Sequence, residues 1–82
     1  MMKIQKFPIA HIYVPVKRRA TLEQTKVDEI AASIMEKGQE TPIYVRADGD
    51  RYVLVEGLHR LEACKKLGEK NINGYLVQAR RH

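Results

Sequence analysis

A strand that runs through a glycine turn into a helix is the feature that most limits what this chain can fold into. Residues 52–55 are aromatic, β-branched or leucine, which predicts a buried strand. Residues 61–67 favour a helix, and the Gly68 that follows suits a left-handed helix end. Gly57 lies between the two segments, where a missing side chain lets another backbone or a ligand come close. The sequence therefore predicts a strand–turn–helix unit with a glycine at its corner.

The first turn of this helix carries two cationic side chains, His59 and Arg60. Cations are unfavourable there, because the helix dipole already makes that end positive. An anion held by both side chains and by free backbone N–H groups would remove the conflict. We therefore predict a phosphate site at Gly57, His59 and Arg60. Two alternatives need no ligand: His59 bonds a nearby carbonyl oxygen, and Gly57 simply permits close packing of strand and helix.

Length and composition limit the chain to one small domain. Its 82 residues, 44% of them hydrophobic, suffice for one modest core, so 1–82 is expected to be a single domain. No apolar run approaches the roughly 20 residues that a membrane span needs, and the first six residues lack the apolar core of a signal peptide. Cys64 is the only cysteine, which excludes an internal disulfide and fits a reducing compartment. We expect a cytoplasmic protein without a membrane partner.

Two main helices are expected. Thr21 and Gln24 have the spacing of a capping box, with Thr21 as the N-cap and Gln24 reaching back to it. A helix from about residue 22 to 36 should follow and should end at Gly38. The second helix is the one that begins after Gly57.

The strands are expected to form a small mixed sheet, which with the two helices makes an α+β fold. Residues 3–16 should form two extended pieces broken by prolines. Residues 43–46 and 51–55 should pair as an antiparallel hairpin, because the Asp-Gly within 47–50 suits a tight turn. Residues 72–79 supply a last strand. We expect that any homodimer pairs through an edge strand, and that this last strand is the place.

The first helix has two faces. One is an apolar stripe for the core, formed by Val27, Ile30, Ala31 and Ile34. The other is polar and includes Lys26, Glu29 and Ser33. This polar face is either a solvated helix side or the rim of the phosphate site, where Lys26 would add a positive charge and Ser33 a hydroxyl.

The formal net charge of +5 suggests a polyanionic partner. Much of the excess comes from two clusters, Lys17, Arg18 and Arg19 near the start and Arg80 and Arg81 near the end. These residues are either solvated surface charges or contacts to DNA. No aromatic side chains interleave with the clusters, so a stacking platform for single strands is not indicated.

Three segments in the order 22–34, 41–45 and 53–63 carry a family resemblance. The third contains Gly57-Leu58-His59-Arg60 and is the most specific. Together they resemble the ParB N-terminal domain and sulfiredoxin superfamily, whose members share a Gly-x-His-Arg signature or the Gly-Glu-Arg-Arg box of partition proteins. The resemblance extends over nearly the whole chain and implies a ParB/sulfiredoxin-like fold.

The resemblance also implies nucleotide binding. Carried over by position, the phosphate-binding residues are Gly57, His59 and Arg60. Lys26 of the first helix would assist, and Ser33 is a weaker candidate. The implied ligand is ATP or CTP, with Mg²⁺ as a companion.

Departures from the family pattern limit which of the family's activities are expected of this chain. Sulfiredoxins need a nucleophilic cysteine just before the His-Arg pair, and Leu58 stands there, so that activity is not expected. Cys64 is expected to be a packed core residue. Glu56 matches an acidic residue of the superfamily's serine kinases and could act as a base or hold Mg²⁺. Its alternative role is an ion pair with Arg60 or another cation. We assign neither a protein metal site nor a catalytic residue.

Two functions remain open. The first is a nucleotide-binding module in a plasmid, phage or chromosome-partition setting, with slow nucleotide hydrolysis an open question. The second is a DNA-binding accessory protein or ParB-like nuclease that acts through the basic clusters. Replacing Arg60 should abolish the first function, while neutralising residues 17–19 should leave it largely intact. For the second function the basic clusters should matter most, and the affinity for DNA should fall steeply as the salt concentration rises.

Overall fold

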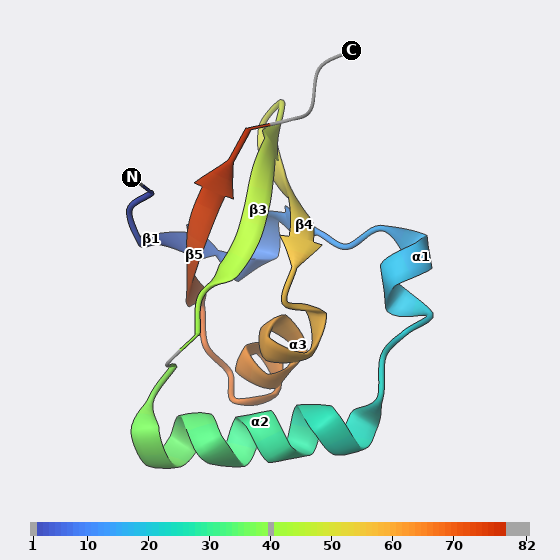
Figure 1. The fold of residues 1–82 in the computed structure, drawn as a ribbon, viewed down its shortest axis with the longest axis vertical. Helices are drawn as coiled ribbons and strands as arrows, with labels where there is room; N and C mark the ends of the chain where they lie inside the picture. The colour runs from blue at the N-terminus through green and yellow to red at the C-terminus, as the bar shows by residue number, and fades with distance from the viewer. Residues whose placement is uncertain (1, 40, 79–82) are drawn as a thin grey trace.

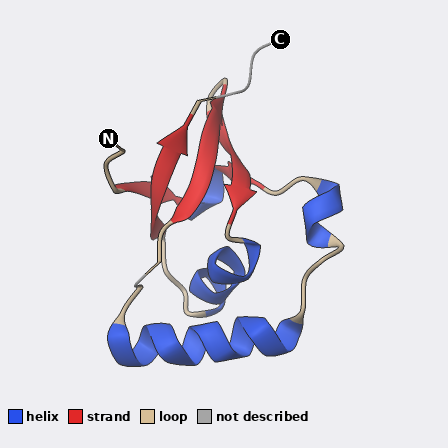
Figure 2. Ribbon diagram, viewed as in Figure 1, coloured by secondary structure: helices blue, strands red, loops and turns tan. Residues whose placement is uncertain are grey.

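The computed structural model describes residues 2–39 and 41–78 (Figures 1 and 2). The elements follow one another as β1 (Gln5–Pro8), the 3₁₀ turn η1 (Ile9–His11), β2 (Ile12–Tyr13), α1 (Val16–Arg19), α2 (Gln24–Lys37), β3 (Ile43–Asp48), β4 (Arg51–Glu56), α3 (Leu58–Lys66) and β5 (Asn71–Val77). The predicted α+β class, with a small mixed sheet and two main helices, is confirmed. Within the described part of the chain, no helix is long and apolar enough to cross a bilayer.

The five strands form one sheet in the order β1-β5-β3-β4-β2. β3 and β4 make the predicted antiparallel hairpin, and Gly49 turns it with a φ of 63°. β1 is antiparallel to β5, whereas β5 runs parallel to β3 and β2 parallel to β4. The predicted last strand is present, although Ala79 at its expected end lies outside the described residues.

The last strand, β5, is not an edge strand of the sheet, although the expectation about a homodimer assumed that it was. β5 lies between β1 and β3, and it pairs with β1 over residues 71–74 and with β3 over residues 74–77. The edges of the sheet are β1 and β2. A second copy therefore cannot add a strand along the whole of β5, because β1 and β3 each already occupy part of its backbone donors and acceptors.

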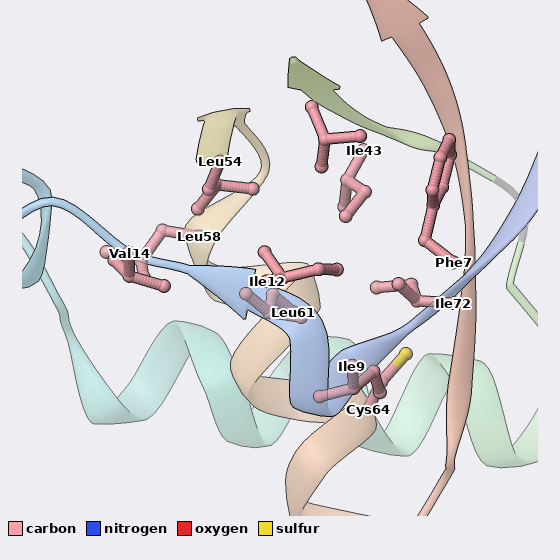
Figure 3. Packing of buried hydrophobic residues seen from close by; sticks show 11 residues of the cluster. Phe7, Ile9, Ile12, Val14, Ile43, Leu54, Leu58, Leu61, Cys64 and Ile72 are labelled. Carbon is pink, nitrogen blue, oxygen red and sulfur yellow. The ribbon is translucent and has the colours of Figure 1, made fainter. Parts of the chain in front are cut away.

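The hydrophobic core lies between α3 and the sheet. In Figure 3, apolar side chains from the β1–η1–β2 segment approach those of the central strands and α3. The buried cluster consists of Phe7, Ile9, Ile12, Val14, Ile43, Val45, Leu54, Leu58, Leu61, Cys64 and Ile72. Cys64 is only 2% exposed, which confirms that it is a packed core residue.

α2 packs against α3 on the side away from the core, as Figure 1 shows. Val27 and Ala31 of α2 are buried against Ala63 of α3, and Ile30 and Ile34 are partly buried beside them. The predicted apolar stripe is therefore confirmed. Because α3 is packed on two sides, the position of its N-terminal end is fixed by both the sheet and α2.

One ion pair links the two helices at their surface. Lys66 of α3 donates a hydrogen bond to the Asp28 carboxylate of α2. This bond, assisted by one from Gln24, lowers the pKa of Asp28 below its ordinary value. The contact therefore stabilises the helix pair most when Asp28 is ionised.

The predicted capping box is wrong. Glu23, not Thr21, is the N-cap of α2, and the helix begins at Gln24, about two residues later than expected. The Thr21 hydroxyl instead donates a 2.7 Å hydrogen bond to the carbonyl oxygen of Arg18, at the end of α1. The sequence contained no strong periodic signal for a four-residue helix, so the hydroxyl was assigned to the wrong helix end.

Candidate functional site

Gly57 turns the chain from β4 into α3. It is the N-cap of α3 and has a left-handed conformation, with φ 108° and ψ 32°. α3 begins at Leu58, so His59 and Arg60 lie in its first turn as predicted. The first N–H groups of a helix have no partner within the helix. The turn therefore presents backbone donors, the imidazole of His59 and the guanidinium of Arg60 at the same helix end.

Gly57 is needed here for packing as well as for conformation. A Cβ atom at this position would lie 2.6 Å from Cγ2 of Ile43 and 3.0 Å from its Cβ. Ile43 is fully buried in β3. The space beside Gly57 is therefore occupied by the core, which agrees with the close-packing alternative considered from the sequence.

A pocket of about 320 Å³ opens at this helix end. Its lining comprises Arg18, Thr21, Ile30, Glu56, Gly57, Leu58, His59 and Arg60. Gly57, His59, Arg60 and Glu56 thus come together as the sequence suggested. Arg18 joins them from α1, although from the sequence it was a candidate for DNA contact only. Arg18 could not be placed at the pocket from the sequence, because local patterns do not show the direction of the chain after Pro15.

His59 makes a contact that the sequence could not predict. Its Nε2 accepts a 3.0 Å hydrogen bond from the backbone N–H of Glu23, the N-cap residue of α2. The expected alternative partner was a local carbonyl oxygen, and the observed partner is instead a distant N–H group. Because Nε2 is the acceptor, the ring proton belongs on Nδ1, which is the nitrogen left to donate to an anion.

Glu56 and Arg18 face each other across the pocket mouth. Their closest charged atoms, Oε1 and Nη1, are 3.9 Å apart, and the side chains are 73% and 44% exposed. Such an open, long pair contributes little to stability. Glu56 therefore pairs with a nearby cation, as one alternative held, and that cation is Arg18. An incoming anion can displace this contact at small cost.

Lys26 and Ser33 lie on the exposed side of α2 and are not among the residues that line the pocket. The ammonium group of Lys26 is 3.2 Å from the Glu23 carboxylate. Lys26 precedes the lining residue Ile30 by four positions and is therefore one helical turn from the pocket. Ser33 follows Ile30 by three positions, so it lies about one turn from Ile30 in the direction away from Lys26.

The basic clusters have different surroundings. Lys17, Arg18 and Arg19 are exposed on α1. The Nε of Arg19 donates a 3.1 Å hydrogen bond to the carbonyl oxygen of Val14, which ties α1 to the preceding chain. Arg80 and Arg81 lie outside the described residues.

Cys64 and the acidic residues that the structure describes do not form a nucleophilic or metal site. Burial, and then the charge of Glu69, raises the pKa of the Cys64 thiol. A buried thiol with a raised pKa is a poor nucleophile. Leu58 occupies the position before the His-Arg pair and is buried. Across residues 2–39 and 41–78, no group of three histidine, cysteine or acidic side chains could hold a metal ion.

Comparisons with known proteins agree with this geometry. The sequence profile of the ParB N-terminal domain matches residues 1–82. The chain belongs to the ParB N-terminal domain family. A probable chromosome-partitioning protein ParB from Campylobacter jejuni is 37% identical to this ParB-type domain over 63 residues, which is 77% of the chain and 23% of the relative. The domain therefore spans less than a quarter of that partition protein's length.

Two solved structures share the fold of this ParB-type domain. Sulfiredoxin from Arabidopsis thaliana superposes with a TM-score of 0.83 at 32% identity, over 94% of this chain and 86% of the sulfiredoxin chain. A C-terminally truncated ParB from Caulobacter crescentus, complexed with CTP-γ-S, has a TM-score of 0.77 at 25% identity, over 98% and 46% of the two chains. The predicted ParB/sulfiredoxin-like fold is confirmed.

Proposed function

We propose that the pocket at the N-terminal end of α3 binds the phosphate groups of a nucleoside triphosphate, CTP or ATP. The observation that carries the proposal is the convergence of Arg18, His59 and Arg60 on one open pocket beside the free N–H groups of α3. Guanidinium groups and helix N-terminal donors are the groups that proteins use to bind phosphate oxygens. The single acidic group in the lining, Glu56, already faces Arg18.

The electrostatic balance of the pocket supports an anionic ligand. Two guanidinium groups and the positive end of a helix dipole face one carboxylate. Bound phosphates would neutralise this excess. His59 would donate from Nδ1 while Nε2 keeps its bond to Glu23, so the ring can contact phosphate without releasing α2. Glu56, which is mostly exposed, would be free to coordinate a phosphate-bound Mg²⁺ once Arg18 turns to the ligand.

The relatives support the choice of nucleotide. The Caulobacter ParB structure is a complex with a CTP analogue, and the similarity to it covers 98% of this chain. Together with the similarity to chromosome-partitioning ParB, this makes CTP the first ligand to test and a partition-type process the setting we infer. DNA binding by the basic cluster of α1 has less support, because Arg18 lines the pocket at α3 and Arg19 is bonded to the carbonyl oxygen of Val14.

The test is an NMR and calorimetric titration with CTP, ATP and cytidine, with and without Mg²⁺. We expect CTP or ATP to shift the amide signals of residues 57–61, and cytidine to shift none of them. Arg60→Gln and Arg18→Gln should each weaken binding by about tenfold or more, the usual effect of removing a hydrogen bond to a charged group.

Lys17→Gln is the matched control, because it removes the same charge from α1 next to Arg18 without changing the pocket lining. It should leave the nucleotide affinity within about twofold, the level of a screened surface charge. Equal losses in Lys17→Gln and Arg18→Gln would contradict the proposal, as would a triphosphate titration that leaves residues 57–61 unshifted.

A further inference from the structure

The sheet has a second face that the core does not use. On β3, Ile43 and Val45 point into the core, so Tyr44 and Arg46 point to the opposite side of the sheet. Tyr44 pairs in register with Tyr75 of β5. The two rings lie side by side, with centroids 5.3 Å apart and planes tilted by 41°. Both tyrosines are partly exposed.

A third tyrosine lies on the same face at the other side of the sheet. Tyr13 of β2 pairs with Val53 of β4, the neighbour of Leu54, so both lie on the face opposite the main buried cluster, where Val53 is only 4% exposed. The guanidinium of Arg51 lies 4.2 Å from the centre of the Tyr13 ring, and that of Arg19 lies 5.9 Å from it. We call Tyr13, Tyr44 and Tyr75 the tyrosine face.

Cationic side chains flank the tyrosine face. Arg46 is the next outward residue after Tyr44 on β3, and Lys6 of β1 pairs with Asn73, the outward residue before Tyr75 on β5. Arg51 lies at the far side, where its Nε is 3.0 Å from the Asp48 carboxylate. The described residues of this face thus carry more positive than negative charge. In Figure 1, α2 and α3 lie together at one end of the strands, so these helices do not cover the face.

We propose that the tyrosine face binds single-stranded nucleic acid. Exposed aromatic rings stack on unpaired bases, and flanking arginine or lysine side chains neutralise the phosphates that connect them. The half-buried Tyr44–Tyr75 pair supplies the rings on the central strands, and Arg46 and Lys6 supply charges on two sides of it. None of the three tyrosines lines the pocket at α3, so the two ligands need not compete.

Other occupants fit this face less well. A second copy of the chain in a two-fold interface would set the same patch against itself and would bring like charges together. Double-stranded DNA keeps its bases stacked on one another, so its bases are not available to the rings. A single strand satisfies both the rings and the charges.

The test measures fluorescence anisotropy of a labelled oligo(dT) of about 15 nucleotides, near the upper site size of small single-strand binding domains. An oligo(U) and a DNA duplex of the same length are measured in parallel. Tyr75→Ala should weaken single-strand binding about tenfold, the usual loss of one stacking contact, whereas Tyr75→Phe keeps the ring and should stay within about twofold. Arg46→Gln should weaken binding and reduce its salt dependence.

Lys37→Gln is the charge control, because Lys37 is exposed in the last turn of α2, away from the tyrosine face. It should change single-strand affinity by less than Arg46→Gln does. Circular dichroism checks that each variant folds. If Tyr75→Ala does not fold, NMR spectra of the unmodified protein with oligo(dT) test whether the oligonucleotide binds at the tyrosine face. In that case the amide shifts should cluster at residues 44–46 and 75–77.

Several results would overturn the proposal. These are tighter binding to the duplex than to either single strand, amide shifts confined to residues 57–61, and equal affinities for the folded Tyr75→Ala and Tyr75→Phe variants. Binding of oligo(dT) or of oligo(U) with the expected dependence on Tyr75 and Arg46 supports it.

Discussion

Replacing Gly57 with alanine tests the corner on which the candidate site is built. The change acts in two ways. A side chain at φ 108° is strained by about 1–2 kcal/mol, the cost typical of left-handed backbone. The added Cβ would also lie 2.6 Å from Cγ2 of the buried Ile43, and overpacking of this kind costs about 1–3 kcal/mol. We therefore expect Gly57→Ala to lower the free energy of unfolding by about 2–5 kcal/mol.

This loss is large for a domain of 82 residues, whose total stability is expected to be about 4–12 kcal/mol. The assay is urea unfolding followed by far-ultraviolet circular dichroism, with the free energy extrapolated to water. Gly49→Ala is the matched control, because Gly49 has a φ of 63° and no atom within 4 Å of an added Cβ. It should cost only the backbone strain of about 1–2 kcal/mol.

The excess of Gly57→Ala over Gly49→Ala therefore measures the clash with Ile43. Replacing Ile43 with leucine removes the branch at Cβ that carries Cγ2, so the double variant Gly57→Ala/Ile43→Leu should lose less stability than the two single changes predict together. Equal losses at Gly57 and Gly49, or strict additivity in the double variant, would refute the packing argument. The strain argument would fail if Gly49→Ala cost nothing.

Two further predictions follow from the shifted pKa values. Lys66→Gln should raise the pKa of Asp28 toward its ordinary value in an NMR pH titration. In the unmodified protein, the contribution of Asp28 to stability is present above its unfolded-state pKa. That contribution is lost as the pH falls through the lowered folded-state pKa. An unchanged Asp28 titration would contradict this. Cys64 should react with a thiol reagent far more slowly in the folded protein than in urea. The contribution of Cys64 to stability should be lost as the pH rises above the unfolded-state pKa of the thiol toward the raised folded-state pKa. Equal reaction rates in both states would show that the thiol is accessible.

Structural features formed by residues close together in the chain could be predicted from the sequence. The turn at Gly57, the first helical turn with His59 and Arg60, and the Asp48-Gly49 hairpin each depend on residues close together in the chain. The apolar stripe of α2 was equally clear, because its spacing repeats with the helix. In these segments the preference of each residue and the packing of the whole domain agree.

Contacts between segments far apart in the chain could not be predicted from the sequence. Arg18 reaches the pocket only because α1 leads the chain across the mouth of the site. The hydrogen bond from Glu23 to His59 joins residues 36 positions apart. The tyrosine face gathers its rings from β2, β3 and β5, so no interleaving of aromatic and basic residues appears along the sequence. Each depends on the strand order, which local patterns do not determine.

The interior position of β5 has a consequence for how the domain is made. β1 pairs with β5 alone, so the first strand of this domain finds its partner only after the other strands of the domain have been synthesised. Until then, the open edge of β3 is a template on which strands of other nascent chains could add. Closure of the sheet should therefore be a late and slow step, since it joins the segments most distant in the chain.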